Sequence, residues 1–419
     1  MTVTALAPDD RGYLTVSPAG GERPLVSSLN YLAGATISNQ QLVRLGDGGL
    51  SVFSRAATDV TVDVRGYFVA ADGVAADGRF VPLTPRRLLD TRDVGRPDPS
   101  EPVRVAAGVP ADAVAVAVSV ATTDTLGAGS FAIGAAGSPR RDSPVLTVDR
   151  MGQTRSASTI AAVSDAAFDV RSSRGDHIIV DITGYFTGPS AESSADGLFV
   201  AAAPTRILDS RLAYGSNGGP RLWDHGARAV DVSTFTGGPV AALALNLTVT
   251  ETEDRGYAVA SAANTNRPHI SSINYDTANM TIASSSIVRT STAGVAVYAR
   301  EATHVVLDVT GWFTGPPQEA DGPAPRNEPP PDRHVTIIGD SAMAGLRWNG
   351  AYGGLRGFVA NPRLESCRRL VAASCNGREG YNPRTAASQI SALPPAGPED
   401  ILVIATGYND WHPRLSLIH

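Results

Sequence analysis

The stretch HVTIIGDSAMAGL, from His334 to Leu346, organises the C-terminal part of this 419-residue chain. Val335 to Ile338 is a short run of mostly β-branched apolar residues, which predicts a buried strand. The run stops at Gly339, and Asp340 and Ser341 follow where a helix would begin. Unpaired N–H groups and the helix dipole at such a position favour negative charge. The pattern therefore fits a serine nucleophile whose attack produces an oxyanion.

A second strand of the same kind follows later in the chain. Ile401 to Thr406 reads ILVIAT and predicts another buried strand, and GYND from Gly407 to Asp410 comes directly after it. Ligands of open α/β sheets bind beyond the carboxyl ends of the parallel strands. If the two strands are parallel, they bring Ser341 and Asn409 to the same edge of one sheet.

The segment between these strands predicts a helix. Asn382 is the expected N-cap, and an apolar stripe at helical spacing runs from Ala386 to Leu393. Pro394 and the proline after it would end the helix. Strand, helix and strand predict a parallel unit with a right-handed crossover. The glycine-rich residues 347–359 predict no definite element.

GDS after one buried strand and GYND after another resemble the sequence blocks of the SGNH, or GDSL-type, hydrolases, which cleave esters with a serine nucleophile. The resemblance implies that Ser341 attacks the ester. It also implies that the oxyanion is held by the N–H of Ser341, by a glycine N–H of a middle block and by the Asn409 side chain. Gly380 is the expected middle-block glycine, with Gly377 as the alternative, because GREGYNPRT departs from the usual pattern.

The same resemblance implies a base, because serine is a poor nucleophile until a neighbouring group removes its proton. In the family this base is a histidine three residues after an aspartate, and no such block follows Asn409 in the sequence. His412 is the nearest histidine, but an asparagine precedes it at the family's spacing. Asp340 and Gly407 are expected to support the site, and no cofactor is expected. We expect an esterase in a longer parent protein and little or no activity from residues 333–419 as they stand.

Two cysteines lie close together in this part of the chain. Cys367 and Cys375 belong to the segment SCRRLVAASC. A local disulfide bridge of a secreted protein is the preferred interpretation, and two reduced core cysteines are the alternative. A metal site is not expected, because neither a histidine nor a further cysteine is near enough to complete a tetrahedral shell.

An internal repeat dominates residues 1–315. DGRFVPLTPRRLLDTR, from Asp77 to Arg92, returns as DGLFVAAAPTRILDSR, from Asp196 to Arg211, a period of 196 − 77 = 119 residues. Each unit closes on a β-branched strand with an aromatic end; these strands are VTVDVRGYF at 60–68, IIVDITGYF at 178–186 and VVLDVTGWF at 305–313. Such strands and frequent turns predict β-sandwich-like units, each large enough to hold its own core, with a trefoil or a propeller as the less favoured alternatives.

The fold class expected is therefore multidomain, with tandem all-β repeats before a truncated α/β domain that contains a parallel sheet. MTVTALAPDDRGY at the start parallels LTVTETEDRGY from Leu247, so the first repeat is expected to lack its LDTR segment and the chain to be a fragment. The proline-rich linker predicts a stiff, extended spacer. The expected domains are an N-truncated β-repeat at 1–71, β-repeats at 72–190 and 191–315, the linker at 316–332 and a partial SGNH hydrolase domain at 333–419.

Charged residues recur with the repeat. Asp90 with Arg92, and Asp209 with Arg211, could form a carboxylate–guanidinium site. A pair that returns in each unit is better explained as a structural ion pair or turn. The same interpretation applies to the aspartates of the closing strands, Asp63, Asp181 and Asp308.

Composition restricts the partners. The net charge is −6 and the pI about 5.7, so a global basic surface for nucleic acid is excluded. No apolar run approaches the roughly 20 residues that a membrane-spanning helix needs. The 42 glycines indicate many turns, as β-rich domains require.

The LDTR repeats resemble those that accompany catalytic domains in secreted actinobacterial proteins. This resemblance implies a secreted or cell-wall setting, although the chain begins without a signal-peptide pattern.

Two functions from different classes follow. The first is a secreted serine esterase that acts on an ester-bearing small molecule, a lipid or an acylated polysaccharide. The alternative is a non-catalytic protein whose β-repeats bind the cell wall or a polysaccharide and whose hydrolase part is a remnant. The sequence identifies neither the substrate nor the ligand of the repeats.

Overall fold

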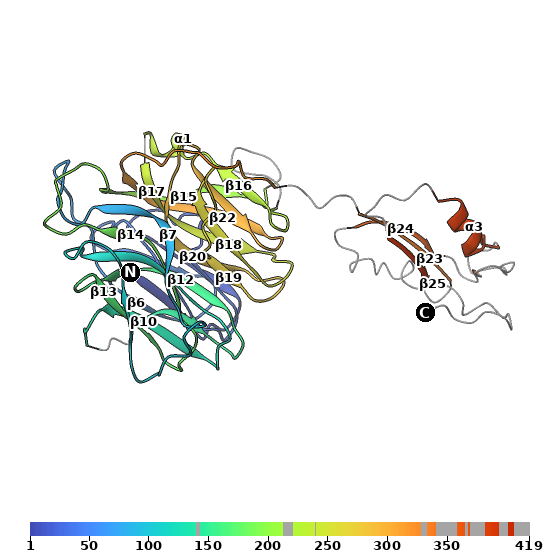
Figure 1. Cartoon of the computed structure of the whole chain (residues 1–419), viewed down its shortest axis with the longest axis horizontal. Coiled ribbons are helices and arrows are strands. Elements are labelled where there is room, and N and C mark those ends of the chain that lie inside the picture. The colour runs from blue at the N-terminus through green and yellow to red at the C-terminus, as the bar shows by residue number, and fades with distance from the viewer. Residues whose placement is uncertain are drawn as a thin grey trace. The chain divides into compact units, whose positions relative to one another are not determined.

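The computed structural model describes residues 1–139, 143–212, 221–238, 240–327, 333–340, 358–364, 368, 382–393 and 401–405. The chain divides into two compact units, residues 1–327 and 328–419 (Figure 1). The described part is mostly β-strand, with few helices, and the sheets of the first unit are antiparallel. The β-rich, multidomain organisation expected from the sequence is confirmed at this level.

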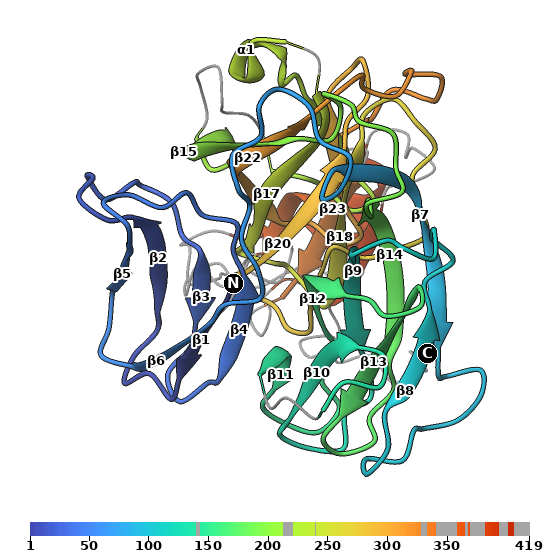
Figure 2. The same ribbon diagram turned by 90° about the vertical axis from the view of Figure 1, so that its left-hand side faces the viewer.

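The first repeat, drawn in blue in Figure 2, contains two three-stranded sheets. Its strands are β1 (Thr2–Leu6), β2 (Gly12–Pro18), β3 (Leu29–Tyr31), β4 (Ile37–Gln40), β5 (Leu50–Ser54) and β6 (Asp59–Asp63). One sheet has the order β4-β1-β6 and the other β3-β2-β5.

The second repeat contains two four-stranded sheets. Its strands are β7 (Phe80–Asp90), β8 (Val103–Ala106), β9 (Ala115–Thr122), β10 (Gly129–Ala135), β11 (Pro144–Val148), β12 (Arg155–Ala162), β13 (Ala167–Ser172) and β14 (Ile179–Phe186). The sheet orders are β12-β9-β14-β7 and β11-β10-β13-β8.

The third repeat has the same plan. Its elements are β15 (Phe199–Asp209), β16 (Ala227–Val230), α1 (Ser233–Thr236), β17 (Val240–Thr250), β18 (Gly256–Ala262), β19 (Ile273–Tyr275), β20 (Ile282–Arg289), β21 (Val295–Ala299) and β22 (His304–Thr314). The sheet orders are β15-β22-β17-β20 and β16-β21-β18-β19. Read from the other end, the first of these matches the order of the second repeat's first sheet, strand for strand.

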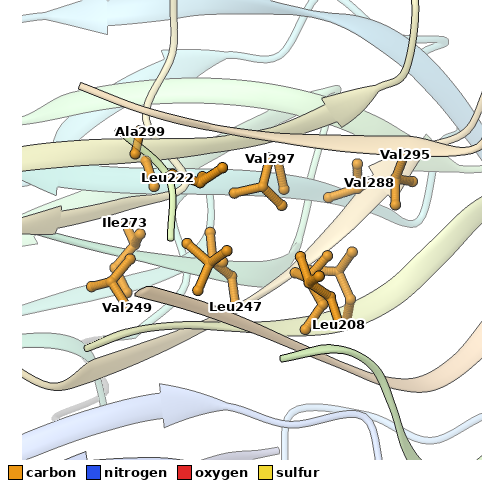
Figure 3. Close-up of a cluster of buried hydrophobic side chains, with 14 of the residues drawn as sticks. Leu208, Leu222, Leu247, Val249, Ile273, Val288, Val295, Val297 and Ala299 are labelled. Carbon is orange, nitrogen blue, oxygen red and sulfur yellow. The ribbon is translucent and has the colours of Figure 1, made fainter. Parts of the chain in front are cut away.

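Each repeat buries its own apolar core between its two sheets. Alternating or continuous apolar runs such as VAALALNLTVT place side chains on the inner face of the sheet, where burial stabilises the fold by roughly 25 cal/mol per Å². In the third repeat, Leu247 of β17 and Val297 of β21 come from opposite sheets and lie in one cluster (Figure 3). The expectation of sandwich-like units with their own cores agrees with these sheets and clusters.

The three closing strands end in phenylalanines that meet at one point. The ring centroids of Phe68 and Phe186 are 5.9 Å apart, those of Phe68 and Phe313 6.1 Å, and those of Phe186 and Phe313 6.0 Å. Three nearly equal distances between equivalent residues indicate an approximate threefold axis. The repeats therefore form one closed assembly, residues 1–327, in place of separate modules in a row.

Polar side chains form hydrogen bonds between the first repeat and each of the other two. Asn39 Nδ2 donates to Asn246 Oδ1 at 3.0 Å between the first and third repeats. Gln40 Oε1 accepts from the backbone N–H of Ile160 at 2.6 Å between the first and second. These polar groups are satisfied across the interfaces, which fixes how the repeats fit together.

Part of the expected linker packs on the third repeat. The N–H of Gln318 donates to the carbonyl of Thr290, and the Gln318 carbonyl accepts from Thr292. Asn327 binds the backbone of Trp223 and, through Nδ2, that of Arg221. Residues 316–327 therefore differ from the extended spacer predicted for 316–332, because their own polar groups find partners on the sandwich.

The second unit contains a small parallel sheet with the order β24-β23-β25. Its elements are β23 (Arg333–Gly339), β24 (Phe358–Leu364), α3 (Ala386–Ser391) and β25 (Ile401–Ala405). The strands predicted at Val335–Ile338 and at Ile401–Thr406 are present as β23 and β25, and they pair in parallel. The prediction that the second strand is buried was wrong: the side chains of 401–404 are 37–45% exposed, and β25 lies at the edge of the described sheet. No pattern of residues predicted β24, which contains Pro362 and follows a glycine-rich stretch.

The helix predicted before β25 is present but begins later than expected. Thr385 is the N-cap of α3, and its Oγ1 accepts the N–H of Ser388 at 3.2 Å. The assignment of Asn382 as the cap was wrong, because the threonine hydroxyl satisfies the helix's free N–H group. Ala386, the first residue of the predicted apolar stripe, is buried.

Candidate functional site

The parallel sheet supplies the framework of the candidate hydrolase site. Gly339, the last residue of β23, lies opposite Ala405, the last residue of β25. The next residue, Asp340, is buried, and its backbone N–H donates to the Ala405 carbonyl at 3.3 Å. The two strands therefore end in register at one edge, the edge where ligands of parallel sheets bind.

Of the site residues predicted from the sequence, Asp340 alone lies within the described part of the chain. The residues outside it are Ser341, Gly380, Asn409, Gly407, the alternative Gly377, the histidine His412 and the cysteines Cys367 and Cys375. Their expected roles, including the oxyanion donors and the disulfide, therefore stay predictions.

Side chains around β24 and α3 hold this sheet to its helix. The guanidinium of Arg363, at the end of β24, donates to Gln389 Oε1 of α3 at 2.6 Å. Arg368 is fully buried and donates to the Arg384 carbonyl. A buried arginine needs partners of this kind, because an unpaired buried charge is costly. No pattern in the sequence predicted a role for Arg363 or Arg368.

In the third repeat, one arginine joins two buried carboxylates. Arg206 Nε lies 2.9 Å from Asp308 Oδ1, and Arg206 Nη1 lies 3.0 Å from Asp209 Oδ2. Arg211 completes the cluster, 2.6 Å from Asp209. The cluster ties the LDTR strand β15 to the closing strand β22, so the structural interpretation of these residues is confirmed.

The second repeat contains the same cluster in a more exposed form. Arg87 pairs with Asp181 at 3.0 Å and with Asp90 at 2.8 Å, and Arg92 pairs with Asp90 at 2.5 Å. In the first repeat, the carboxylate of Asp63 forms no side-chain hydrogen bond or ion pair with any residue that the structure describes. Of the two structural roles predicted for Asp63, an ion pair or a turn, the ion pair is therefore not formed with a described residue, and the charge of Asp63 acts at longer range on the guanidinium of Arg65.

The two aspartates of each cluster have opposite pKa shifts. Hydrogen bonding from Arg92 lowers the pKa of the Asp90 carboxyl to about 2, and Arg211 lowers the pKa of Asp209 in the same way. Burial raises the pKa of Asp308, and the hydrogen bond from Arg206 opposes this rise. Such shifts mark functional sites and structural ion-pair networks alike, and their recurrence in two repeats favours a structural role here.

The Asp90–Arg92 pair predicts a pH-dependent loss of stability in the variant Arg92→Ala. A carboxyl with a lowered folded-state pKa stabilises the fold above its unfolded pKa of about 4, and this stabilisation is lost as the pH falls towards about 2. We expect Arg92→Ala to cost about 1 kcal/mol at pH 6, less than the full shift implies, because water screens the half-exposed arginine. Urea unfolding of both proteins between pH 2 and 6 checks this: a difference that does not shrink towards pH 2 would contradict it.

A serine–histidine contact also occurs in the repeats. Ser210 Oγ lies 3.1 Å from His304 Nδ1, and Thr91 Oγ1 lies 3.2 Å from His177 Nδ1 in the equivalent place. The Ser210 hydroxyl is buried and accepts the N–H of Val305 at 2.8 Å. Because threonine replaces serine in the other repeat and the hydroxyl already binds the backbone, this contact is structural and not a nucleophile with its base.

An open hollow of ≈ 270 Å³ lies between the second and third repeats. Its lining includes Arg87 and Arg92 of the second repeat and Tyr257, Arg267 and Asn274 of the third. Aromatic, amide and guanidinium groups can bind hydroxyl and anionic groups of a ligand. No local pattern in the sequence predicted this hollow, because its residues come from distant parts of the chain.

Within the described residues, no group of three or more His, Cys, Asp or Glu side chains gathers as a metal site. In the same part of the chain, none of the helices is both long and apolar enough to cross a bilayer.

Comparisons with known proteins assign no family to the chain. None of the protein-family models matches it, and a search of curated proteins finds no similar sequence. A function for the chain is therefore inferred from its own residues and geometry.

Proposed function

We propose that the second unit carries the nucleophile and oxyanion blocks of a serine esterase of the SGNH type, within a secreted protein. The observation that carries this proposal is the parallel pairing of β23 with β25, with Gly339 opposite Ala405. Ser341 follows Gly339 by two residues and Asn409 follows Ala405 by four. Both residues therefore follow, in the sequence, strands that end at the same edge of one sheet, and this supports the proposal.

In the proposed reaction, the Ser341 hydroxyl attacks the acyl carbon of an ester and loses its proton to a base. The oxyanion accepts hydrogen bonds from the N–H groups of Ser341 and Gly380 and from the Asn409 side chain. The alcohol leaves with a proton from the base, and water then releases the acid from the serine. The substrate class is an ester-bearing small molecule, a lipid or an acylated polysaccharide.

Covalent labelling tests the nucleophile. Because no Asp-x-x-His block follows Asn409 in the sequence, imidazole supplies the base from solution. A fluorophosphonate probe should form a phosphorus–oxygen bond with Ser341 and release fluoride, at a rate that rises with imidazole concentration. Mass spectrometry of the digested chain locates the label. We expect Ser341→Ala to abolish this label and Asn409→Ala to slow its formation.

Ser416→Ala is the matched control, because Ser416 lies in the same unit but outside both sequence blocks. This variant should be labelled like the unchanged chain. Labelling that survives in Ser341→Ala, or no label on Ser341 at any imidazole concentration, would contradict the proposed function.

The hollow between the second and third repeats supports a second candidate function, the binding of a cell-wall glycan by the repeats. Tyr257 and Arg267 line the hollow, and the Tyr257 ring packs against Tyr298 with its centroid 6.1 Å away. An aromatic ring that lines a hollow can pack against the apolar face of a sugar ring. This binding is compatible with an esterase in the second unit, which would then act on the acylated glycan.

A further inference from the structure

The hollow between the second and third repeats is lined by basic side chains. Arg87 and Arg92 belong to the second repeat, and Arg267 and His269 belong to the third. Among the described residues that line the hollow there is no aspartate or glutamate. Walls that carry one sign of charge attract a ligand of the opposite sign. The composition of the lining therefore favours an anionic ligand.

One arginine of this lining has no acidic partner in the described part of the chain. Ion pairs with two aspartates already neutralise Arg87 and Arg92. By contrast, Arg267 is exposed and forms neither an ion pair nor a hydrogen bond with any residue that the structure describes. Its guanidinium N–H groups are therefore free to donate to a ligand. A guanidinium binds a carboxylate or a phosphate through paired, charge-assisted hydrogen bonds.

Stacking on an aromatic ring fixes the position of this guanidinium. Arg267 Cζ lies 3.7 Å from the centroid of the Tyr298 ring, well within the range of a cation–π contact. Tyr298 is held in turn by His225, whose Nδ1 lies 2.9 Å from the tyrosine hydroxyl oxygen. An arginine that is already positioned in this way loses less conformational freedom when it binds an anion.

The lining also offers an oxygen acceptor and a flat ring. Asn274 lines the hollow, and its buried Oδ1 accepts no hydrogen bond from any described residue. An unsatisfied buried acceptor is costly, and a ligand hydroxyl can satisfy it, either directly or through a water molecule. The Tyr257 ring lines the same hollow and can pack against the apolar face of a sugar. Together, these groups fit a ligand with an anionic group, hydroxyls and an apolar face.

Contacts between the two repeats keep the hollow in a fixed shape. Arg150 of the second repeat pairs with Asp276 of the third at 2.9 Å. Ser119 Oγ of the second repeat donates to the carbonyl of Ser271, a residue of the lining, at 3.3 Å. A site that is formed before the ligand arrives avoids the cost of ordering its walls.

The first repeat contains the same stacked arginine in a different setting. Residues 23–31 repeat the motif of residues 267–275, and Arg23 Cζ lies 3.8 Å from the centroid of the Phe53 ring. The acceptor differs, however, because Asn30 Oδ1 already accepts a hydrogen bond from a serine hydroxyl at 3.1 Å. The unsatisfied acceptor therefore distinguishes the hollow between the second and third repeats from its counterpart, and the first repeat supplies a matched control.

We propose, on the basis of the second candidate function, that this hollow binds a sugar unit that carries an anionic group, either a carboxylate or a phosphate. Arg267 binds the anionic group through its free N–H donors. Asn274 accepts a hydrogen bond from a sugar hydroxyl, and the Tyr257 ring packs against the face of the sugar. A neutral sugar leaves the arginine without a partner, so the site prefers acidic glycans to neutral ones.

Three sugars that differ only in the group at one carbon test the preference. The probes are galactose, galacturonic acid and galactose 6-phosphate, and saturation-transfer difference NMR with the full chain measures the Kd of each. At least one of the two acidic sugars should bind about tenfold more tightly than galactose, because a charge-assisted hydrogen-bonded pair is gained. The tighter of the two identifies the group as a carboxylate or a phosphate. Added sodium chloride should reduce the preference, since it screens the charges.

Two variants separate the charge from the ring. Arg267→Gln should reduce the preference for the acidic sugar to less than about twofold and should leave the binding of galactose unchanged, because only the ion pair is lost. Tyr257→Ala should weaken the binding of all three sugars by the same factor and keep the preference. Arg23→Gln is the matched control: it removes the stacked arginine of the first repeat and should change neither the affinity nor the preference. Thermal unfolding checks that each variant is folded.

The possible failures are distinguishable. Equal affinity for galactose and both acidic sugars would overturn the inference of an anionic ligand and would leave glycan binding in place. Binding of none of the three sugars would overturn the inference together with the second candidate function. Acetate that binds as tightly as galacturonic acid would show that the site takes an anion without a sugar, against the proposal. A preference that survives in Arg267→Gln, or that Arg23→Gln removes, would place the anion elsewhere. None of these measurements depends on the esterase proposal.

Discussion

Replacing Arg206 by methionine is expected to destabilise the repeat unit by about 3 kcal/mol at pH 7, because the change leaves the buried carboxylate of Asp308 without its cation, whereas Asp209 keeps Arg211. Arg206 pairs with both Asp209 and Asp308, and each of these side chains is 2% exposed. Methionine keeps much of the volume of the arginine stem, so the loss reports the charge and not a cavity. The midpoint of urea unfolding at pH 7 measures the effect.

The pH dependence distinguishes this mechanism from lost packing. Burial already raises the pKa of Asp308, and removing the Arg206 hydrogen bond raises it further. A carboxyl with a raised folded-state pKa stabilises the fold where it is protonated, and that stabilisation is lost as the pH rises through the folded pKa. The cost of Arg206→Met should therefore be smaller at pH 4 than at pH 7.

The control for this prediction is Asp63→Asn in the first repeat. The carboxylate of Asp63 has no ion-pair partner among the described residues, so its neutralisation should change stability by no more than about 0.5 kcal/mol. Equal effects of the two variants would show that the arginine–aspartate clusters do not hold the LDTR strand to its neighbour.

Local sequence predicted the strands well because their signals are local. The apolar runs around Val335 and Ile401 became β23 and β25. The alternation of apolar and polar residues that a half-buried strand requires can be read directly from the sequence. The repeat also predicted that Asp209 and Arg211 are structural, since a pair that returns in each unit is explained by what the units share.

Other features depended on contacts that no local pattern contains. The meeting of Phe68, Phe186 and Phe313 joins residues more than 100 positions apart, so the sequence predicted tandem repeats and did not indicate that they close around one axis. Helix α3 begins at Ala386 because the hydroxyl of its N-cap, Thr385, reaches a free N–H group. The strand β6 stops at Asp63, five residues before its predicted end, and pairs with β1 alone.

The candidate esterase site was predicted from two short blocks, and the structure describes their framework. The register of Gly339 with Ala405 joins two apolar strands, which sequence reasoning can find, although the side chains of β25 are exposed. The buried Arg368 and the Arg363–Gln389 bond were missed, since charged residues predict surface positions unless their partners are known.

Introducing alanine at Gly311 and at Gly66 is expected to change stability in opposite directions. At Gly311 the new Cβ would lie 2.6 Å from the Val200 carbonyl, a backbone atom that cannot move without disturbing the pairing of β15 with β22. Overpacking of this kind costs about 2–3 kcal/mol. At Gly66 no atom lies within 4 Å of the Cβ position, and the backbone is outside the left-handed region. Alanine there should stabilise the chain by about 0.5 kcal/mol, because it restricts the unfolded state.

The sign of the difference matters more than its size. Both glycines belong to the same motif, GYF at Gly66 and GWF at Gly311, and follow the closing-strand aspartate by three residues. If their local backbone alone required glycine, both substitutions would destabilise. Thermal unfolding of the two variants therefore tests whether the neighbouring LDTR strand is what demands a glycine. A destabilised Gly66→Ala would show that the local backbone, and not the neighbouring LDTR strand, demands the glycine.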